Sequence, residues 1–183
     1  MGIVLVITLS LILATLLWMM YRHSIVNNAR LYSLPANVVV SPAHGTVLSV
    51  QKLFNGSTEV VIFLAPIDVH DQYVPINGKV VQSVYDGNGQ YEIQGFACKG
   101  KDNEKHITTF QTNYGLVQVK QIAGLLFRQI TNEAKETMHM TRGDKLGRIS
   151  FGSRVDIIVP PRCTVIVTPG QYVNGPNSVI GWF

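Results

Sequence analysis

Cysteine and charge are both scarce in this chain of 183 residues. Its two cysteines, Cys98 and Cys163, form no CxxC or Cys/His pair with metal-ligand spacing, so the pattern predicts no disulfide framework and no metal site. Charged residues make up only 14% of the chain and hydrophobic residues 46%, a composition that excludes disorder as the main state. The net charge of +4 suits an anionic lipid surface, but no basic run with interleaved aromatic residues points to a nucleic-acid partner.

Charge is entirely missing from the first 21 residues. Residues 3–20 are nearly all apolar and would form about 27 Å of helix, close to the roughly 30 Å hydrocarbon core of a bilayer. Trp18 and Tyr21 lie where an interfacial aromatic belt is expected, and the first cation, Arg22, follows them. The pattern predicts a single-pass transmembrane helix over residues 1–22, with the rest of the chain on the cytoplasmic side.

A secretory signal peptide is the competing interpretation of this segment. It would need a positive n-region and a small-x-small cleavage site, and neither is clear here. A linker over residues 23–36 and one domain over residues 37–183 complete the predicted organisation. The length suits one domain with a real core.

Short Val/Ile-rich runs separated by Gly, Pro and Asn dominate the chain after the linker. Such runs, bounded by Asn-Gly and Asp-Gly turn signals, are typical of strands. We therefore expect a mostly β (α+β) fold, a compact β-sandwich or barrel-like domain. The expected strands are residues 37–40, 46–50, 59–64, 79–84, 116–119, 155–159 and 164–167.

One segment breaks the strand pattern. Ile122, Leu125, Leu126 and Ile130 are spaced as on one face of an amphipathic helix, which predicts one main helix over residues 122–133.

Two segments share a faint internal similarity. Residues 74–80 and 167–173 each place a Gly turn between strands, as the hairpins of biotinyl- and lipoyl-type domains do. This weak signal motivates an alternative function, a membrane-tethered biotinyl/lipoyl-like adaptor. The chain lacks the lysine-tipped hairpin that a carrier of biotin or lipoate needs.

Four separated blocks carry a family resemblance. They are residues 41–45 (SPAHG), 63–70 (FLAPIDVH), 103–105 (NEK) and 143–160 (GDKLGRISFGSRVDIIVP). In this order, they resemble the blocks of the phosphatidylserine decarboxylases, and the last is similar to the short, archaeal-type members nearly throughout. The resemblance covers residues 37–181.

The resemblance implies a proenzyme that breaks its own chain between Gly152 and Ser153. The Ser153 hydroxyl attacks the preceding carbonyl, β-elimination releases the upstream chain, and hydrolysis leaves a pyruvoyl group on the downstream chain. The two chains would be residues 1–152 and 153–183. On local sequence alone, Gly-Ser would be an ordinary turn.

The implied cofactor is therefore the self-derived pyruvoyl group. Its carbonyl would form a Schiff base with the amine of phosphatidylserine and accept the electrons left when carbon dioxide departs, as pyridoxal phosphate does elsewhere. The implied reaction yields phosphatidylethanolamine. The implied partners are this phospholipid, the membrane and the two chains of the cleaved protein, and a homo-oligomer is left open.

Two histidines are the remaining site candidates. By resemblance, His70 occupies the catalytic position associated with proton transfer. His44 stands where the family has an Asp, and an imidazole is a chemically plausible base for self-cleavage. Asp68 is expected mainly to cap a turn. Because His44 departs from the family pattern, a catalytically inactive, lipid-binding relative is the alternative function.

Arginine is the residue type best suited to a lipid phosphate, because its guanidinium binds two oxygens at once. Arg128, Arg148 and Arg154 are therefore candidates for such a contact, although each is more often a solvated or structural charge.

Overall fold

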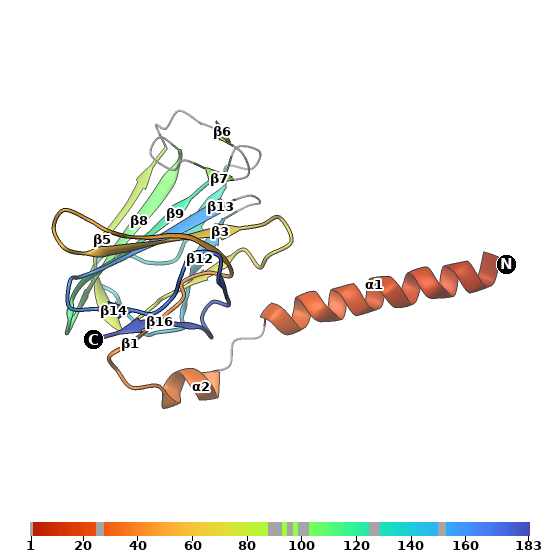
Figure 1. Ribbon diagram of the computed structural model, residues 1–183, viewed down its shortest axis with the longest axis horizontal. Helices are drawn as coiled ribbons and strands as arrows, with labels where there is room; N and C mark the ends of the chain where they lie inside the picture. Colours follow the sequence, from red (N-terminus) through yellow and green to blue (C-terminus); the bar gives the residue numbers. More distant parts are fainter. Residues whose placement is uncertain are drawn as a thin grey trace.

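The computed structural model describes residues 2–24, 28–87, 93–94, 97–98, 103–124, 129–149 and 153–183. Two helices come first, α1 (Gly2–Ser24) and α2 (Asn28–Ser33), and the remaining described elements are strands. Figure 1 shows α1 projecting away from the β domain, with α2 lying against it. The mostly β fold expected from the sequence is confirmed.

The strands of the first half of the domain are β1 (Val38–Val40), β2 (Gly45–Lys52), β3 (Thr58–Leu64), β4 (Asp71–Tyr73), β5 (Gly78–Asp86), β6 (Ile93–Gln94), β7 (Ala97–Cys98) and β8 (Lys105–Thr112). Those of the second half are β9 (Gly115–Ile122), β10 (Ile130–Asn132), β11 (His139–Met140), β12 (Lys145–Ile149), β13 (Ser153–Val159), β14 (Thr164–Val165), β15 (Tyr172–Val173) and β16 (Val179–Trp182).

The main sheet has eight antiparallel strands in the order β11-β5-β8-β9-β13-β3-β2-β15. Two three-stranded sheets, β10-β12-β4 and β1-β16-β14, and the β6-β7 pair accompany it. The central strands β3 and β13 share one burial pattern, in which alternate side chains such as Val60 and Ile62 are fully buried. This alternation identifies the face of the sheet that packs on the core.

The barrel-like part of the prediction is wrong, because no sheet closes on itself within the described residues. The main sheet begins at β11 and ends at β15, and each of these strands pairs with one neighbour only among the described residues. Both end strands are two residues long, so each leaves little unpaired edge.

The helix predicted over residues 122–133 is also wrong where the chain is described. Ile122 is the last residue of β9, where it pairs with Lys105, and Ile130 opens β10. Residues 125–128 of the predicted helix lie outside the described residues. The backbone ladders at both ends therefore override a helical spacing that rests on four side chains.

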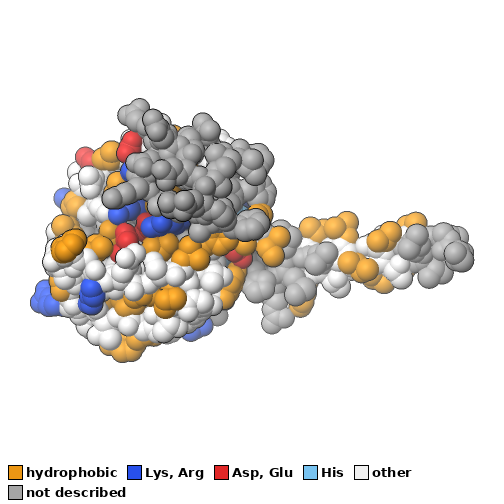
Figure 2. Space-filling model, turned by 45° about the horizontal axis from the view of Figure 1, so that its top comes forward, with side chains coloured by type: hydrophobic (Ala, Val, Ile, Leu, Met, Phe, Trp, Pro, Cys, Tyr) orange, Lys and Arg blue, Asp and Glu red, His pale blue; other side chains and the backbone are white. Residues whose placement is uncertain are grey.

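Helix α1 coincides with the segment predicted to span the membrane. Its described apolar side chains, such as Val6, Leu11 and Trp18, are more than half exposed, and Figure 2 shows them along its length. Within the described part of the chain, however, no helix is both long and apolar enough to cross a bilayer.

Helix α2 is attached to the domain by a buried arginine. The Arg142 guanidinium donates to four carbonyl oxygens, of Leu31, Leu34, Pro35 and Val38, at 2.7 to 3.1 Å. A cation at the C-terminal end of a helix also interacts favourably with the helix dipole.

Packing adds to this attachment. Leu31 is buried over Gly143, where an added Cβ would lie 2.6 Å from the leucine Cδ1. Gly143 also has a φ of +90°, so a side chain there would be both crowded and strained.

Candidate active site

Ser153 is the first residue of β13, in the middle of the main sheet. It pairs with Leu64 at the end of β3 and is completely buried. Among the described residues its Oγ has no hydrogen-bond partner. A buried hydroxyl without a partner costs about 1–3 kcal/mol, so such a group often has a functional explanation.

The peptide bond predicted to break lies just before this strand. Gly152 is outside the described residues, which resume at Ser153. The last described residue before the gap is Ile149 at the end of β12, and its backbone N–H donates to the His70 carbonyl at 3.2 Å. The segment that carries the Gly152–Ser153 bond therefore begins beside His70.

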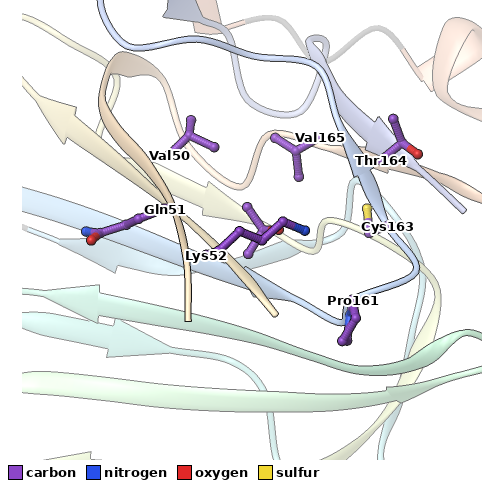
Figure 3. Close-up of a pocket in the computed structure, with 8 residues that line it drawn as sticks. Val50, Gln51, Lys52, Pro161, Cys163, Thr164 and Val165 are labelled. Carbon is purple, nitrogen blue, oxygen red and sulfur yellow. The ribbon is translucent and has the colours of Figure 1, made fainter. Parts of the chain in front are cut away.

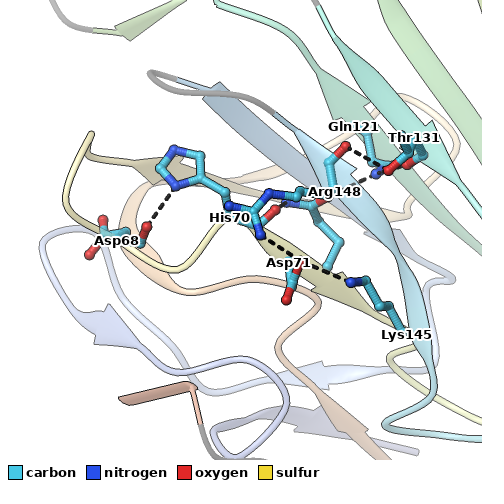
Figure 4. A network of polar contacts seen from close by, with 8 residues as sticks. Asp68, His70, Asp71, Gln121, Thr131, Lys145 and Arg148 are labelled. Atoms are coloured by element: carbon cyan, nitrogen blue, oxygen red, sulfur yellow. Dashed lines mark hydrogen bonds and ion pairs between the residues drawn. The ribbon is translucent and has the colours of Figure 1, made fainter. Parts of the chain in front are cut away.

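His70 is buried just before β4, and its ring is oriented by the backbone. The ring Nδ1 lies 2.6 Å from the carbonyl oxygen of Asp68, as Figure 4 shows. Because a carbonyl can only accept, the neutral ring carries its proton on Nδ1 and leaves Nε2 as the basic nitrogen.

Burial lowers the pKa of His70 below 6.5. The charge of Arg148 lowers this pKa further, while the hydrogen bond to the Asp68 carbonyl opposes the shift. The imidazole is therefore mainly neutral at pH 7, the form that accepts a proton.

Asp68 uses its carboxylate in the turn rather than on the imidazole. One oxygen accepts from the Ala65 N–H at 2.7 Å and the other from the Tyr172 hydroxyl at 2.6 Å. This agrees with the expected turn-capping role. No pattern in the sequence indicated that the backbone carbonyl of the same residue would hold His70.

His44 is buried between β1 and β2, at the same end of the sheet as Ser153. Two residues later, Thr46 pairs with Phe63, the neighbour of Leu64 on β3. The backbones are close here, since a Cβ on Gly45 would lie 2.1 Å from the Phe63 carbonyl oxygen. Glycine is therefore required directly after His44.

The three candidates converge on the C-terminal end of β3. Ser153 and the segment of His44 flank it on opposite sides, and His70 follows the turn beyond it. Tyr73 on β4 connects the two histidine segments, because its ring lies edge-on to His44 with centroids 6.1 Å apart. Burial and the charge of Asp71 raise the Tyr73 pKa to about 12, so the phenol stays protonated at neutral pH.

A series of hydrogen-bonded side-chain amides ends at the backbone carbonyl of His70. Gln72 donates to the His70 carbonyl at 2.7 Å, and Gln121 donates to the Gln72 side chain at 2.8 Å. Asn132 donates in turn to Gln121 at 2.7 Å. Sequence reasoning missed this network, because its members come from β4, β9 and β10 and no local motif unites them.

The arginines considered for a lipid phosphate differ in availability. Arg154 donates to the buried carboxylate of Asp156 at 2.8 Å. Burial raises the pKa of that carboxyl, and the hydrogen bond from Arg154 opposes the shift. Arg148 lies 3.4 Å from Asp71 with its side chain 60% exposed. Arg128 lies outside the described residues.

The pocket in Figure 3 is not part of this arrangement. It measures about 400 Å³ and is lined by residues such as Lys52, Thr58 and Cys163. Thr58 pairs with Val159, at the opposite end of the β3–β13 ladder from Ser153. At about 3.3 Å per residue, the two ends are roughly 20 Å apart.

In the described part of the chain, no group of His, Cys, Asp and Glu side chains could hold a metal ion.

Comparison with known proteins gives consistent matches. The model of the phosphatidylserine decarboxylase family matches residues 20–181. A phosphatidylserine decarboxylase proenzyme of Solibacter usitatus is 38% identical over 148 residues, which are 80% of this chain and 72% of the relative. That of Pelodictyon phaeoclathratiforme is 35% identical over 149 residues, 78% of this chain and 69% of the relative.

An archaeal relative matches over a longer stretch. A protein of Methanothermobacter thermautotrophicus, assigned as an archaetidylserine decarboxylase proenzyme, is 32% identical over 165 residues, 80% of this chain and 73% of the relative. No solved structure matches the chain significantly. The names of these relatives define the class, the decarboxylase proenzymes. Within it, the chain belongs to the phosphatidylserine decarboxylase family, as the four blocks indicated.

Proposed function

We propose that this chain is a proenzyme that cleaves itself between Gly152 and Ser153 and then converts phosphatidylserine to phosphatidylethanolamine and carbon dioxide. The single observation that carries the proposal is the Ser153 hydroxyl, buried and unpartnered among the described residues. By the resemblance of residues 143–160 it would stand at the family's cleavage position, and two buried histidines share its end of the sheet.

Self-cleavage would proceed in three steps. A base takes the Ser153 hydroxyl proton, Oγ attacks the Gly152 carbonyl carbon, and the amide becomes an ester with the amine of Ser153 set free. Loss of the α-proton of Ser153 then breaks the Cβ–Oγ bond, which releases residues 1–152 as a carboxylate. Finally, water attacks the carbon that carries the freed nitrogen. The nitrogen leaves as ammonia, and a carbonyl remains at the start of residues 153–183.

His44 is proposed as the base for the first step. Its burial and its place beside the end of β3 support this role, because a proton acceptor must come within hydrogen-bond reach of the hydroxyl. The edge-on Tyr73 ring limits how the imidazole can turn.

His70 is proposed to move the proton in decarboxylation. The pyruvoyl group, once formed, supplies an electrophilic carbonyl that withdraws electrons from the substrate. Ser153 is buried, and its Oγ has no hydrogen-bond partner among the described residues. Water is excluded from such a position, which suits a reactive carbonyl at the start of the downstream chain. His70 would take a proton at Nε2 from the substrate amine, which arrives protonated, and return it to the carbon from which carbon dioxide has left. Nδ1 stays held by the Asp68 carbonyl throughout.

The phospholipid substrate is supported by the names of the relatives. They include a phosphatidylserine and an archaetidylserine decarboxylase proenzyme, so the serine headgroup is the shared feature. Association with the membrane is supported by α1, whose described apolar side chains are exposed. Arg22 follows the apolar stretch, which favours the cytoplasmic side for the β domain.

The proposal is tested by replacing each histidine alone and measuring cleavage and decarboxylation separately. With His44→Ala we expect the fraction of cleaved chain to fall at least tenfold, a typical loss for a general base. With His70→Ala we expect cleavage to persist while phosphatidylethanolamine formation falls at least tenfold. Gel analysis measures the first quantity and thin-layer chromatography of the lipids measures the second.

His106→Ala is the matched control. His106 is half-buried on β8, where its Nε2 lies 2.9 Å from the Ser83 hydroxyl, and burial lowers its pKa as it does for His70. Strands β9 and β13 separate it from β3 in the main sheet, so cleavage and turnover should both stay at wild-type levels. Loss of cleavage in His106→Ala equal to that in His44→Ala would contradict the assignment.

A further inference from the structure

The turn that joins β3 to His70 presents an apolar tip to solvent. Its residues are 65–69, and at the tip Pro66 is exposed and Ile67 is 83% exposed. A large aliphatic side chain this exposed has no role in the core of the domain.

The tip is held in place from within the turn. The Asp68 N–H donates to the Ala65 carbonyl at 2.9 Å, and the Asp68 carboxylate accepts from the Ala65 N–H and from the Tyr172 hydroxyl. These bonds fix the conformation in which Ile67 points outward, so the exposed side chain sits on a rigid support.

The turn lies at the candidate active site, on the side of the domain from which α1 projects. Leu64, just before it, pairs with Ser153, and His70 directly follows it. In Figure 1 the turn after β3 is on the same side as α1, and the hairpin between β2 and β3 is on the opposite side. The described apolar side chains of α1 are exposed as well.

Positive charge accompanies this apolar tip. Arg148 and Lys145 on β12 have side chains 60% and 46% exposed, and they share one carboxylate, Asp71, at 3.4 and 3.2 Å. Figure 4 shows the three together beside His70. The two cations share Asp71, and the turn itself adds the Asp68 carboxylate, whose two oxygens already accept hydrogen bonds. The exposed ammonium and guanidinium groups are therefore the groups that can bind lipid phosphates here.

We propose that residues 65–69 are a lipid-contacting turn: Ile67 enters the apolar layer of an anionic phospholipid bilayer while Arg148 and Lys145 face its phosphates. The site would then lie at the membrane surface, where a lipid headgroup reaches it without leaving the bilayer. The inference rests on the proposed function for the identity of the substrate, but the contact with lipid is a separate claim. A bilayer fits better than a protein, because a tip of two residues is far smaller than a protein interface of about 800 Å² per partner.

Labelled cysteines test the contact directly. Ile67→Cys and Phe54→Cys, each in the full chain, are labelled with an environment-sensitive fluorophore and reconstituted into vesicles of phosphatidylcholine and phosphatidylglycerol. Phe54 is the matched control, because it is fully exposed next to the Asn55–Gly56 hairpin at the other end of β3. Wild type carried through the same labelling gives the background from Cys98 and Cys163.

The label at 67 should shift its emission to the blue and resist quenching by iodide, while the label at 54 stays open to iodide. Equal quenching at the two positions would overturn the lipid contact. This readout does not depend on turnover, so an inactive wild type would end the proposed decarboxylation without deciding this inference.

A second comparison uses activity. For Ile67→Asp, the ratio of turnover on vesicles to turnover on a monomeric short-chain phosphatidylserine should fall about tenfold relative to wild type, the effect of losing one buried aliphatic side chain. Phe54→Asp should leave the ratio unchanged. An unchanged ratio in Ile67→Asp would contradict the proposal.

Discussion

At the scale of single residues, the partner of His70 is the most informative contact. A histidine that acts in proton transfer often depends on a carboxylate to fix its tautomer. Here the Asp68 carbonyl does this at 2.6 Å, while the carboxylate of the same residue is used in the turn. His70 therefore keeps its orientation without a carboxylate on its Nδ1.

The lowered pKa of His70 predicts how stability depends on pH. The unfolded chain binds a proton near pH 6.5, whereas the folded chain resists protonation because the ring is buried. Stability is therefore full above pH 6.5 and falls as the pH drops through the lowered pKa of the folded state. Denaturation midpoints at pH 7.5 and 5.5 measure this loss.

In His70→Gln, which cannot titrate, the acid-induced loss should be smaller than in wild type. The remaining loss includes His106, whose pKa is also lowered by burial. An equal loss in His70→Gln and wild type would show that His70 does not contribute.

Single residues also show what the sequence could reveal about the site. Ser153 and His70 were predicted from short ordered blocks that match the family pattern, and His44 was predicted from its position in such a block although its residue type differs. Tyr73 and Gln72 could not be assigned roles in this way. Their contacts, the ring edge toward His44 and the amide toward the His70 carbonyl, exist only after β4 is paired with β12.

At the scale of secondary structure elements, the strands were largely predictable, whereas the helix predicted within the β domain is wrong where the chain is described. Val- and Ile-rich runs such as β3 and β13 carry their own signal of alternating burial. The short apolar segment after β9 is ambiguous between helix and strand, and its ends are decided by partners distant in sequence. Ile122, for example, pairs with Lys105 and Arg154.

The amide chain between β4, β9 and β10 gives a prediction at this scale. Gln72→Met removes the donor to the His70 carbonyl and the acceptor of the Gln121 amide, both fully or nearly fully buried. We expect the free energy of unfolding to fall by roughly 1–3 kcal/mol. Urea denaturation measures it, and Gln51→Met, at an exposed position, should change it by less than about 0.5 kcal/mol. A smaller effect at Gln72 than at Gln51 would rule out a supporting role for the network.

At the scale of the whole molecule, the attachment of α2 determines how the N-terminal segment meets the domain. Arg142→Met removes four hydrogen bonds to backbone carbonyls and leaves those of Leu31 and Leu34 without this donor. We expect a loss of roughly 2–4 kcal/mol of stability and faster proteolysis between residues 28 and 37.

Limited proteolysis followed by mass analysis gives the cleavage positions. Arg162→Met, at an exposed position, is the control and should be digested like wild type. If Arg142→Met and Arg162→Met were digested at the same rate and the same places, Arg142 would not hold α2.

Self-cleavage at Ser153 is the step on which the proposed activity depends. The most direct test is the intact mass of the full chain after expression in membranes, compared with Ser153→Ala. We expect wild type to separate into residues 1–152 and a pyruvoyl-blocked chain of residues 153–183, while Ser153→Ala stays whole. A wild-type chain that stays whole under all conditions would exclude self-cleavage and leave a lipid-binding relative of the decarboxylases in its place.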